Sequence, residues 1–226
     1  MRQNHLSGAE SLPSPDASHS TERARFVEVA RKLVEQNGDG ITLGMVASAA
    51  GVPRARVEAH FADDNEMIDA IVETWFVDHI AAMEEVLAAD LPPNRKMYEF
   101  FVRRFRIHRG RYRADPATFE VYCELGAAHF ERVESYVDLA DHYLCELIAQ
   151  AQADGAFPGL EIDQALSLIN QMVFPYTMAE VLTYMDDRLS EEKLAAIVDT
   201  MFVGLSAANR GASGIARIAA VQGRSG

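Results

Sequence analysis

The pattern of residues 21–75 constrains the fold more than any other part of this chain. Apolar residues at its start recur at helical spacing, which predicts an amphipathic helix, and Gly38 favours the end of that helix. Thr42 is a good cap for a second helix, since its hydroxyl can accept a backbone N–H. Gly51 favours a sharp turn, and Pro53 suits the first position of a third helix, where its missing N–H costs nothing. The stretch therefore predicts three short helices with tight connections.

The remaining residues also follow a helical period. β-Branched runs are short, while Ala, Leu, Met, Glu and Arg are plentiful, which favours a helical chain. We expect an all-α fold of about nine helices, and 49% hydrophobic residues among 226 are enough for a sizeable core. Beyond the third helix, the pattern predicts helices over residues 64–89, 94–109, 116–126, 128–153, 162–185 with a kink at Pro175, and 190–209.

Composition divides the chain into four expected segments. Residues 1–20 are polar and lack an apolar period, so we expect a disordered arm. Residues 21–66 form the three-helix head, residues 67–209 a helical body, and residues 210–226 a flexible tail rich in Gly and Ser. Two cysteines are too few for a disulfide framework, and the sequence shows neither a secretory leader nor a membrane-spanning run. We therefore expect a cytoplasmic protein with no membrane contact.

The three-helix head resembles the helix-turn-helix head of the TetR family of bacterial transcriptional regulators. The residues that carry the resemblance fit without a gap: Phe26, Ala30, Leu33, Gly38, Thr42, Val46, Ala47, Ala50, Gly51, Val52, His60, Phe61, Met67 and Ile68. The resemblance implies a helix-turn-helix head on a C-terminal helical bundle that binds a ligand and dimerises. It implies a regulator, most often a repressor, whose homodimer places two recognition helices roughly 34–36 Å apart on pseudo-palindromic double-stranded DNA.

The resemblance also implies which residues would meet DNA. Thr42 would contact a phosphate, and His60 would touch the DNA backbone. Pro53, Arg54 and Arg56 would face the major groove, where an arginine can pair with guanine and discriminate by about 1–3 kcal/mol. Arg25 and its basic neighbours on the first helix can add phosphate contacts.

Acidic residues leave a second interpretation of the head open. The chain has a net charge of −13, which does not attract a polyanion. Glu58 stands where the family often has an aromatic residue, and Asp64 stands where it often has a lysine. The alternative is therefore a helical ligand-binding or protein-interaction module that keeps a relict DNA-binding head.

The body offers a candidate pocket and a candidate dimer interface. Aromatic and methionine side chains can line an apolar cavity between helices, which would suit a largely apolar effector. The candidate pocket residues are Phe101, Phe105, Phe119, Tyr122, Tyr143, Met172 and Tyr176. Broad apolar faces over residues 162–187 and 190–209 suggest that these helices form the homodimer interface as a four-helix bundle.

Residues 95–113 are unusually basic, with eight Lys or Arg residues and one acid. The simplest interpretation is that they neutralise an acidic body within the chain. Two alternatives are a contact with the head that transmits a ligand signal, and direct binding of an anionic ligand or of DNA, because clustered arginine suits carboxylate and phosphate.

Other constellations give weaker signals. Asp138, His142 and Glu146 share one helix face and could hold a divalent metal, although such a row is more often a solvated edge. Cys123 and Cys145 could form a redox switch, although a helical cysteine is more often a small core residue. No phosphate loop, nucleophile elbow or metalloprotease pair is present, so we expect no enzyme activity, cofactor or metal.

Overall fold

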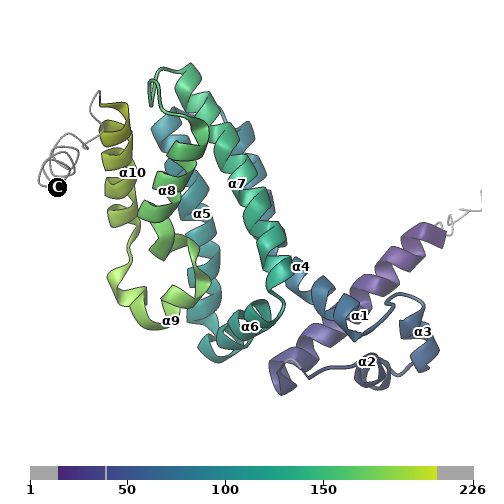
Figure 1. Cartoon of the computed structure of the whole chain (residues 1–226). Coiled ribbons are helices and arrows are strands. Elements are labelled where there is room, and N and C mark those ends of the chain that lie inside the picture. The colour runs from purple at the N-terminus through teal and green to yellow at the C-terminus, as the bar shows by residue number, and fades with distance from the viewer. Residues whose placement is uncertain (1–14, 39, 208–226) are drawn as a thin grey trace, which may run out of the picture. The chain divides into compact units, whose positions relative to one another are not determined.

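The computed structural model describes residues 15–38 and 40–207, and over these residues it contains helices and no strand (Figure 1). The predicted all-α fold is confirmed. The chain divides after Ile71 into two compact units. Within the described ranges, no helix is both long and apolar enough to cross a membrane.

The first unit is the three-helix head together with the start of a fourth helix. It contains α1 (Pro15–Asn37), α2 (Leu43–Ala50), α3 (Arg54–Glu58) and the first turns of α4 (Asp64–Ala88). Helix α2 packs against both α1 and α3. The core of the unit is built from Phe26, Ala30, Val34, Val46, Val57, Phe61 and Met67, all buried at the spacing that the sequence predicts.

Local hydrogen bonds fix the two ends of α2. The Thr42 hydroxyl accepts the Met45 N–H at 3.3 Å, which is the predicted cap. Asp64 also caps this helix, because its Oδ1 accepts the Leu43 N–H at 2.7 Å. At the other end Gly51 adopts φ +68°, a left-handed conformation that glycine accepts without a steric penalty. This turn sets the direction in which α3 leaves α2.

Helix α1 begins earlier than predicted. It starts at Pro15 rather than near residue 22, so the last residues of the expected disordered arm are helical. Proline is accepted in the first turn of a helix, because the N–H groups there have no intrahelical partner. The rest of the expected arm, residues 1–14, and the whole of the expected tail lie outside the described residues.

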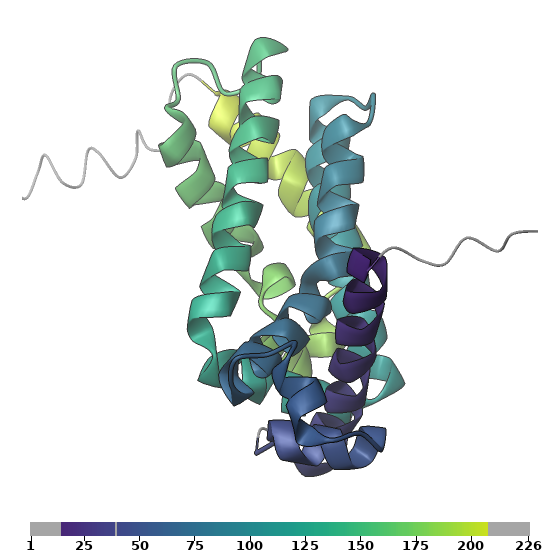
Figure 2. The ribbon, with the colours of Figure 1, turned by 90° about the vertical axis from the view of Figure 1, so that its right-hand side faces the viewer.

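The second unit is a bundle built around α5 (Pro93–Ala114). This helix packs against α6 (Pro116–Ala128), α7 (Phe130–Ala153), α8 (Ile162–Thr177), the short α9 (Leu182–Met185) and α10 (Glu191–Ser206). Figure 2 shows α7 and α8 side by side, and α10 also packs on α8. The buried face of α5 contributes Phe100, Phe101 and Phe105 to the core of this unit.

Helix α8 ends sooner than predicted. The expected helix ran to residue 185 with a kink at Pro175, whereas α8 ends at Thr177 and Met178 is extended, with φ −91° and ψ 118°. Proline supplies no N–H to the helix ladder and clashes with the preceding turn, so the chain leaves the helix soon after it. Two 3-10 turns, Ala179–Val181 and Asp186–Arg188, flank α9 in place of a continuous helix.

Candidate DNA-reading face and ligand cavity

Helix α3 presents its arginines to solvent. The side chains of Arg54 and Arg56 are 67% and 58% exposed. Pro53, which precedes the helix and is its N-cap, is also exposed, whereas Val57 is buried and anchors the helix to the head. The exposed face of α3 is therefore basic and free of large apolar side chains.

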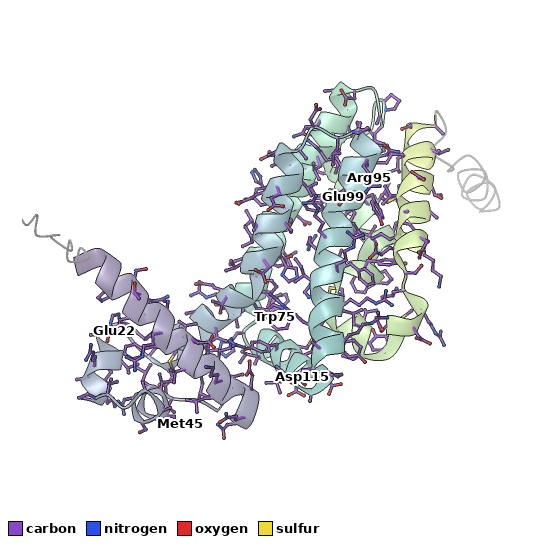
Figure 3. The ribbon with its side chains drawn as sticks, turned by 180° about the vertical axis from the view of Figure 1, so that it is seen from behind. Glu22, Met45, Trp75, Arg95, Glu99 and Asp115 are labelled. Carbon is purple, nitrogen blue, oxygen red and sulfur yellow. The ribbon has the colours of Figure 1, made fainter. Side chains whose placement is uncertain are left out.

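Both arginines of α3 are held by acids of the head. Arg54 Nε donates to Glu58 Oε1 at 2.7 Å, and Arg56 Nε lies 2.7 Å from Glu22 Oε1. Glu22 also lies 3.2 Å from the ring Nε2 of His60. Burial opposes ionisation of Glu22, but the hydrogen bond with His60 and the charge of Arg56 outweigh it and lower the pKa of this carboxyl. Figure 3 marks Glu22 on α1.

Three other candidate DNA contacts have structural roles in the head. The hydroxyl of Thr42 is exposed but caps α2. Arg25 Nη2 donates to the Ala50 carbonyl at 3.1 Å, which satisfies an orphan acceptor at the end of α2. His60 is buried, and its ring meets that of Phe26 edge-on with the centroids 5.4 Å apart, so it lies in the interior of the head.

Most cations of the basic stretch, residues 95–113, pair with acids within the chain, as its simplest interpretation predicts. Arg95 and Arg103 both pair with Glu99 on the same helix, and Figure 3 marks Arg95 and Glu99 on α5. Arg109 and Arg113 share the carboxylate of Asp186. The remaining pairs are Arg103 with Glu85, Arg106 with Glu191 and Arg111 with Asp78, while Lys96 donates to the Leu87 carbonyl and to Gln150.

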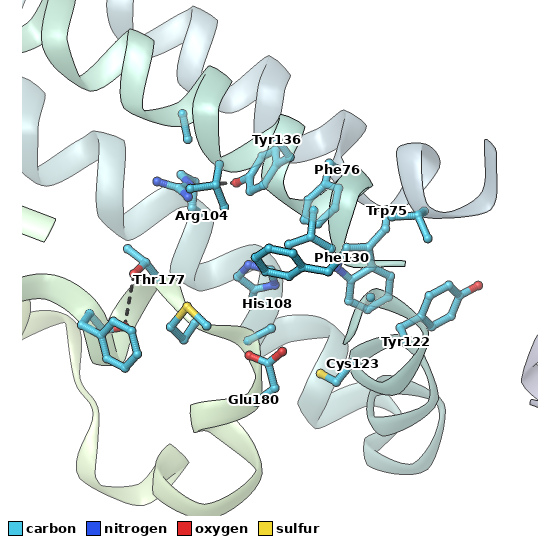
Figure 4. A pocket seen from close by; sticks show the side chains of 18 of the residues that line it. Trp75, Phe76, Arg104, His108, Tyr122, Cys123, Phe130, Tyr136, Thr177 and Glu180 are labelled. Carbon is cyan, nitrogen blue, oxygen red and sulfur yellow. Dashed lines mark hydrogen bonds between the residues drawn. The ribbon is translucent and has the colours of Figure 1, made fainter. Parts of the chain in front are cut away.

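A cavity of about 350 Å³ lies within the second unit. Helices α4 to α8 and the segment that follows α8 line it, and most of its wall is apolar (Figure 4). Its volume falls at the lower end of the range of small-molecule sites, roughly 300–1,000 Å³. Phe130 and Phe174 line it although they are 61% and 51% exposed, so the rim presents apolar surface to water.

Stacked aromatic pairs make one side of the cavity firm. Trp75 stacks on Tyr122 with ring centroids 4.4 Å apart, and Phe76 stacks on Tyr136 at 3.9 Å. Arg111 also contacts Trp75: its guanidinium lies 4.4 Å from the indole centroid and donates to the Trp75 carbonyl at 2.6 Å. These contacts fix the rings before any ligand is present.

Polar groups are few among the lining residues. Arg104 is only 7% exposed, and its Nε donates to the Tyr136 hydroxyl at 3.0 Å. His108 is buried beside it, and burial followed by the charges of Arg104 and Arg111 lowers the pKa of this imidazole to about 3. Asp141 accepts from the Asn170 amide at 2.9 Å, and Glu180 is exposed at the rim.

Comparisons with known proteins agree with this architecture. Residues 93–198 match the family model described as the tetracyclin repressor-like, C-terminal domain. A TetR family regulator from Marinobacter aquaeolei VT8 superposes with a TM-score of 0.57 at 15% identity, over 83% of this chain and 97% of that one. The C-terminal part of the chain thus matches this family of repressor-like domains, and the chain shares the fold of solved TetR family regulators.

Two further solved TetR family regulators share the fold. The regulator PfmR from Thermus thermophilus gives a TM-score of 0.52 at 20% identity, over 81% of this chain and all of that one. A TetR/AcrR family regulator from Thermobifida fusca gives 0.55 at 16% identity, over 81% and 98%. No curated protein matches this chain.

The predicted pocket residues lie in different environments. Tyr122 lines the cavity. Phe101, Phe105, Phe119 and Tyr176 are buried in the body but are not among the lining residues. The Tyr143 hydroxyl donates to Glu84 at 2.9 Å, and Met172 is exposed. Sequence reasoning missed the main lining residues Trp75, Phe76, Arg104, His108, Tyr136 and Phe130.

Neither weaker constellation assembles a reactive centre. His142 Nε2 lies 3.1 Å from Glu146, and the described residues hold no group of three potential metal ligands that includes them. Both cysteines are free thiols. Burial, followed by the charges of nearby carboxylates, raises the pKa of Cys123 to about 12 and also raises the pKa of Cys145, so both thiols stay protonated at neutral pH.

Proposed function

We propose that this protein is a ligand-responsive DNA-binding transcriptional regulator of the TetR type. In this proposal it is a repressor, binds a pseudo-palindromic operator as a homodimer in the cytoplasm, and leaves the operator when a small molecule binds. The observation that carries the proposal is the pair of exposed arginines on α3, the helix that follows the Gly51 turn. Arg54 and Arg56 are the groups that would read guanine in the major groove.

An exposed apolar face supports the dimer. Leu168 on α8 and Val203 on α10 are exposed although both are large and apolar, and these helices pack on one another. The proposed interface comprises residues 162–187 and 190–209. Val203→Glu should shift the protein toward monomer in sedimentation velocity, whereas Ala149→Glu, at an exposed position of α7 outside both ranges, is the control for an added charge. A wild-type monomer at micromolar concentration would exclude this mode of operator binding.

The cavity supports the response to a ligand. Helix α4 begins in the head and supplies Trp75 and Phe76 to the cavity wall, so one continuous helix belongs to both parts of the chain. A ligand that binds one arrangement of α4 more tightly than another shifts the population toward it. Release from the operator then follows from differential affinity, and the same coupling requires operator DNA to weaken ligand binding.

A second candidate is supported by the acids around α3. Glu58 and Glu22 hold the two arginines that would read bases. If these pairs persist next to DNA, the head is a relict and the protein is a ligand-binding or protein-interaction module.

Selection of bound sequences from a random duplex library, at one fixed and moderate salt concentration, distinguishes between the two candidate functions. Enrichment of an inverted repeat supports the regulator. The double variant Arg54→Ala/Arg56→Ala should then lose sequence-specific binding with an unchanged circular dichroism spectrum. The matched control, Arg31→Ala/Lys32→Ala, removes two cations of α1 and should weaken all duplexes alike. Failure to enrich any sequence, with and without cavity ligands, supports the relict head.

A further inference from the structure

Arg104 is an exception within the basic stretch on α5. Every other arginine of residues 95–113 pairs with a carboxylate, whereas Arg104 has no acid within ion-pair distance among the described residues. Its one hydrogen bond in the part of the chain that the structure describes goes from Nε to the neutral Tyr136 hydroxyl. The terminal nitrogens of this guanidinium donate to no described residue.

A buried cation without an anion is costly. Taking a charged group out of water is unfavourable unless a paired charge or hydrogen bonds offset the loss of hydration. Arg104 is only 7% exposed, and the Phe100 and Tyr136 rings lie 5.3 and 5.5 Å from its guanidinium carbon. Ring contacts and one hydroxyl compensate only in part. The side chain lines the cavity, so a molecule in the cavity can supply the missing negative charge.

The surroundings of Arg104 favour an anion over a cation. His108 lies one turn after Arg104 on α5, with its ring centroid 4.2 Å from that of His79, and His108 Nδ1 is buried with no hydrogen-bond partner among the described residues. Two carboxylates line the cavity, and neither pairs with Arg104. Asp141 is engaged by Asn170, and Glu180 is exposed and lies apart from Arg104 and Tyr136 in Figure 4.

We propose that the cavity binds an amphipathic anion, with a carboxylate on Arg104 and an apolar body against the aromatic wall. The terminal nitrogens of the guanidinium match the two oxygens of a carboxylate, which is the geometry that distinguishes arginine from lysine. Trp75, Phe76 and Tyr122 offer ring faces to the body of the ligand, and the exposed rings of Phe130 and Phe174 add apolar surface at the rim. This inference rests on the proposed ligand response and names the class of effector.

Three probes of equal chain length test the proposal: decanoate, decanol and decylamine. Trp75 is the one tryptophan of the chain and lines the cavity, so its fluorescence reports binding without a label. The full-length protein is titrated with each probe below its micelle concentration at neutral pH. Decanoate should bind at least tenfold more tightly than decanol, and decylamine more weakly than both.

Variants assign that preference to Arg104. Arg104→Gln should abolish the advantage of decanoate and leave the affinity for decanol unchanged, which also shows that the cavity is intact. Arg104→Lys should keep part of the advantage, because it restores the charge without the guanidinium geometry. Arg106→Gln is the matched control: it removes a cation of α5 that pairs with Glu191 and does not line the cavity.

The outcomes separate this proposal from the ligand response itself. If decanol binds as tightly as decanoate, or decylamine binds best, the anion assignment is wrong while a ligand-binding cavity remains. If Arg104→Gln weakens decanoate and decanol equally in a folded protein, Arg104 supports the structure and does not select an anion. If none of the three probes changes the Trp75 fluorescence or gives a heat of binding, both the anion assignment and the ligand response fail.

Discussion

Removing the acids that pair with the α3 arginines should strengthen DNA binding, by an amount that follows from the exposure of the two ion pairs. To reach a guanine, Arg54 must leave Glu58 and Arg56 must leave Glu22, so each acid competes with DNA for its arginine. Exposed ion pairs are worth about 0.2–1 kcal/mol, and Arg54 and Glu58 are 67% and 44% exposed. Glu58→Gln should therefore tighten operator binding by up to ~1 kcal/mol, about fivefold.

The second pair should add to the first. Glu22 is only 23% exposed, so the Arg56–Glu22 pair should contribute toward the upper end of the same range. The two pairs share no residue, and the double variant Glu22→Gln/Glu58→Gln should gain up to ~2 kcal/mol, about thirtyfold. Removing negative charge near phosphate adds a further term that falls as salt is raised.

Fluorescence polarisation of the selected operator at low and moderate salt measures these gains. The control is Glu28→Gln, which removes an equal charge from α1 at a residue that pairs with Arg31 and Lys32 instead of α3. An equal gain from Glu28→Gln and Glu58→Gln would show that only overall charge matters, and the competition argument would be wrong. Weaker binding by Glu58→Gln would show that Glu58 itself contacts DNA, for example by accepting from cytosine.

Three further predictions follow from the backbone and from buried groups. Gly51 has φ +68° and open space where a Cβ would be, so Gly51→Ala should destabilise the head by about 1–2 kcal/mol through backbone strain alone. Gly40→Ala is the control and should not destabilise it. Equal midpoints of urea unfolding for the two variants would exclude strain at the turn. Burial lowers the pKa of His108 to about 3 and also lowers the pKa of His79. Below pH ~6.5 the unfolded chain therefore binds more protons than the folded chain. The free energy of unfolding should fall by up to about 1.4 kcal/mol per pH unit for each of the two histidines as pH drops toward 3. His108→Gln should reduce this slope between pH ~6 and ~5, where most carboxylates are still ionised, and an unchanged slope would contradict the assignment. Cys123, whose pKa is raised to about 12, should react with iodoacetamide at pH ~8 far more slowly than a free thiol; rapid alkylation seen by mass spectrometry would reopen the redox interpretation.

The sequence predicts the head well because its signals are local. A threonine cap and a glycine in a left-handed turn act within a few residues, and the structure has both, at Thr42 and Gly51. Pro53 is predicted at the first position of the third helix, and it is instead the extended residue directly before α3. The partners of those residues are not local. Asp64 caps α2 and Glu22 holds Arg56, and neither contact follows from spacing along the chain.

The cavity was harder to predict because periodicity identifies a buried face but not the space beside it. Phe101 and Phe105 have the expected helical spacing and are buried, yet they pack in the core and do not line the cavity. Arg104 lies between them in a stretch whose other arginines all pair with carboxylates. Helix α7 places the Tyr136 hydroxyl, and no carboxylate, next to the Arg104 guanidinium. This difference in partner, which depends on the tertiary structure, distinguishes Arg104 from the other arginines of α5.

The firm side of the cavity has a consequence for the breadth of ligands that the protein can accept. Trp75 and Phe76 are already immobilised by Tyr122, Tyr136 and Arg111, so a ligand that lies against them loses little affinity to the ordering of side chains. The rim is different, because Phe130, Phe174 and Met178 are exposed and must lose rotamer freedom to cover a ligand. Binding should thus be strict about the group at the firm end and tolerant of length and branching at the other, which describes a receptor for a chemical class more than for one compound.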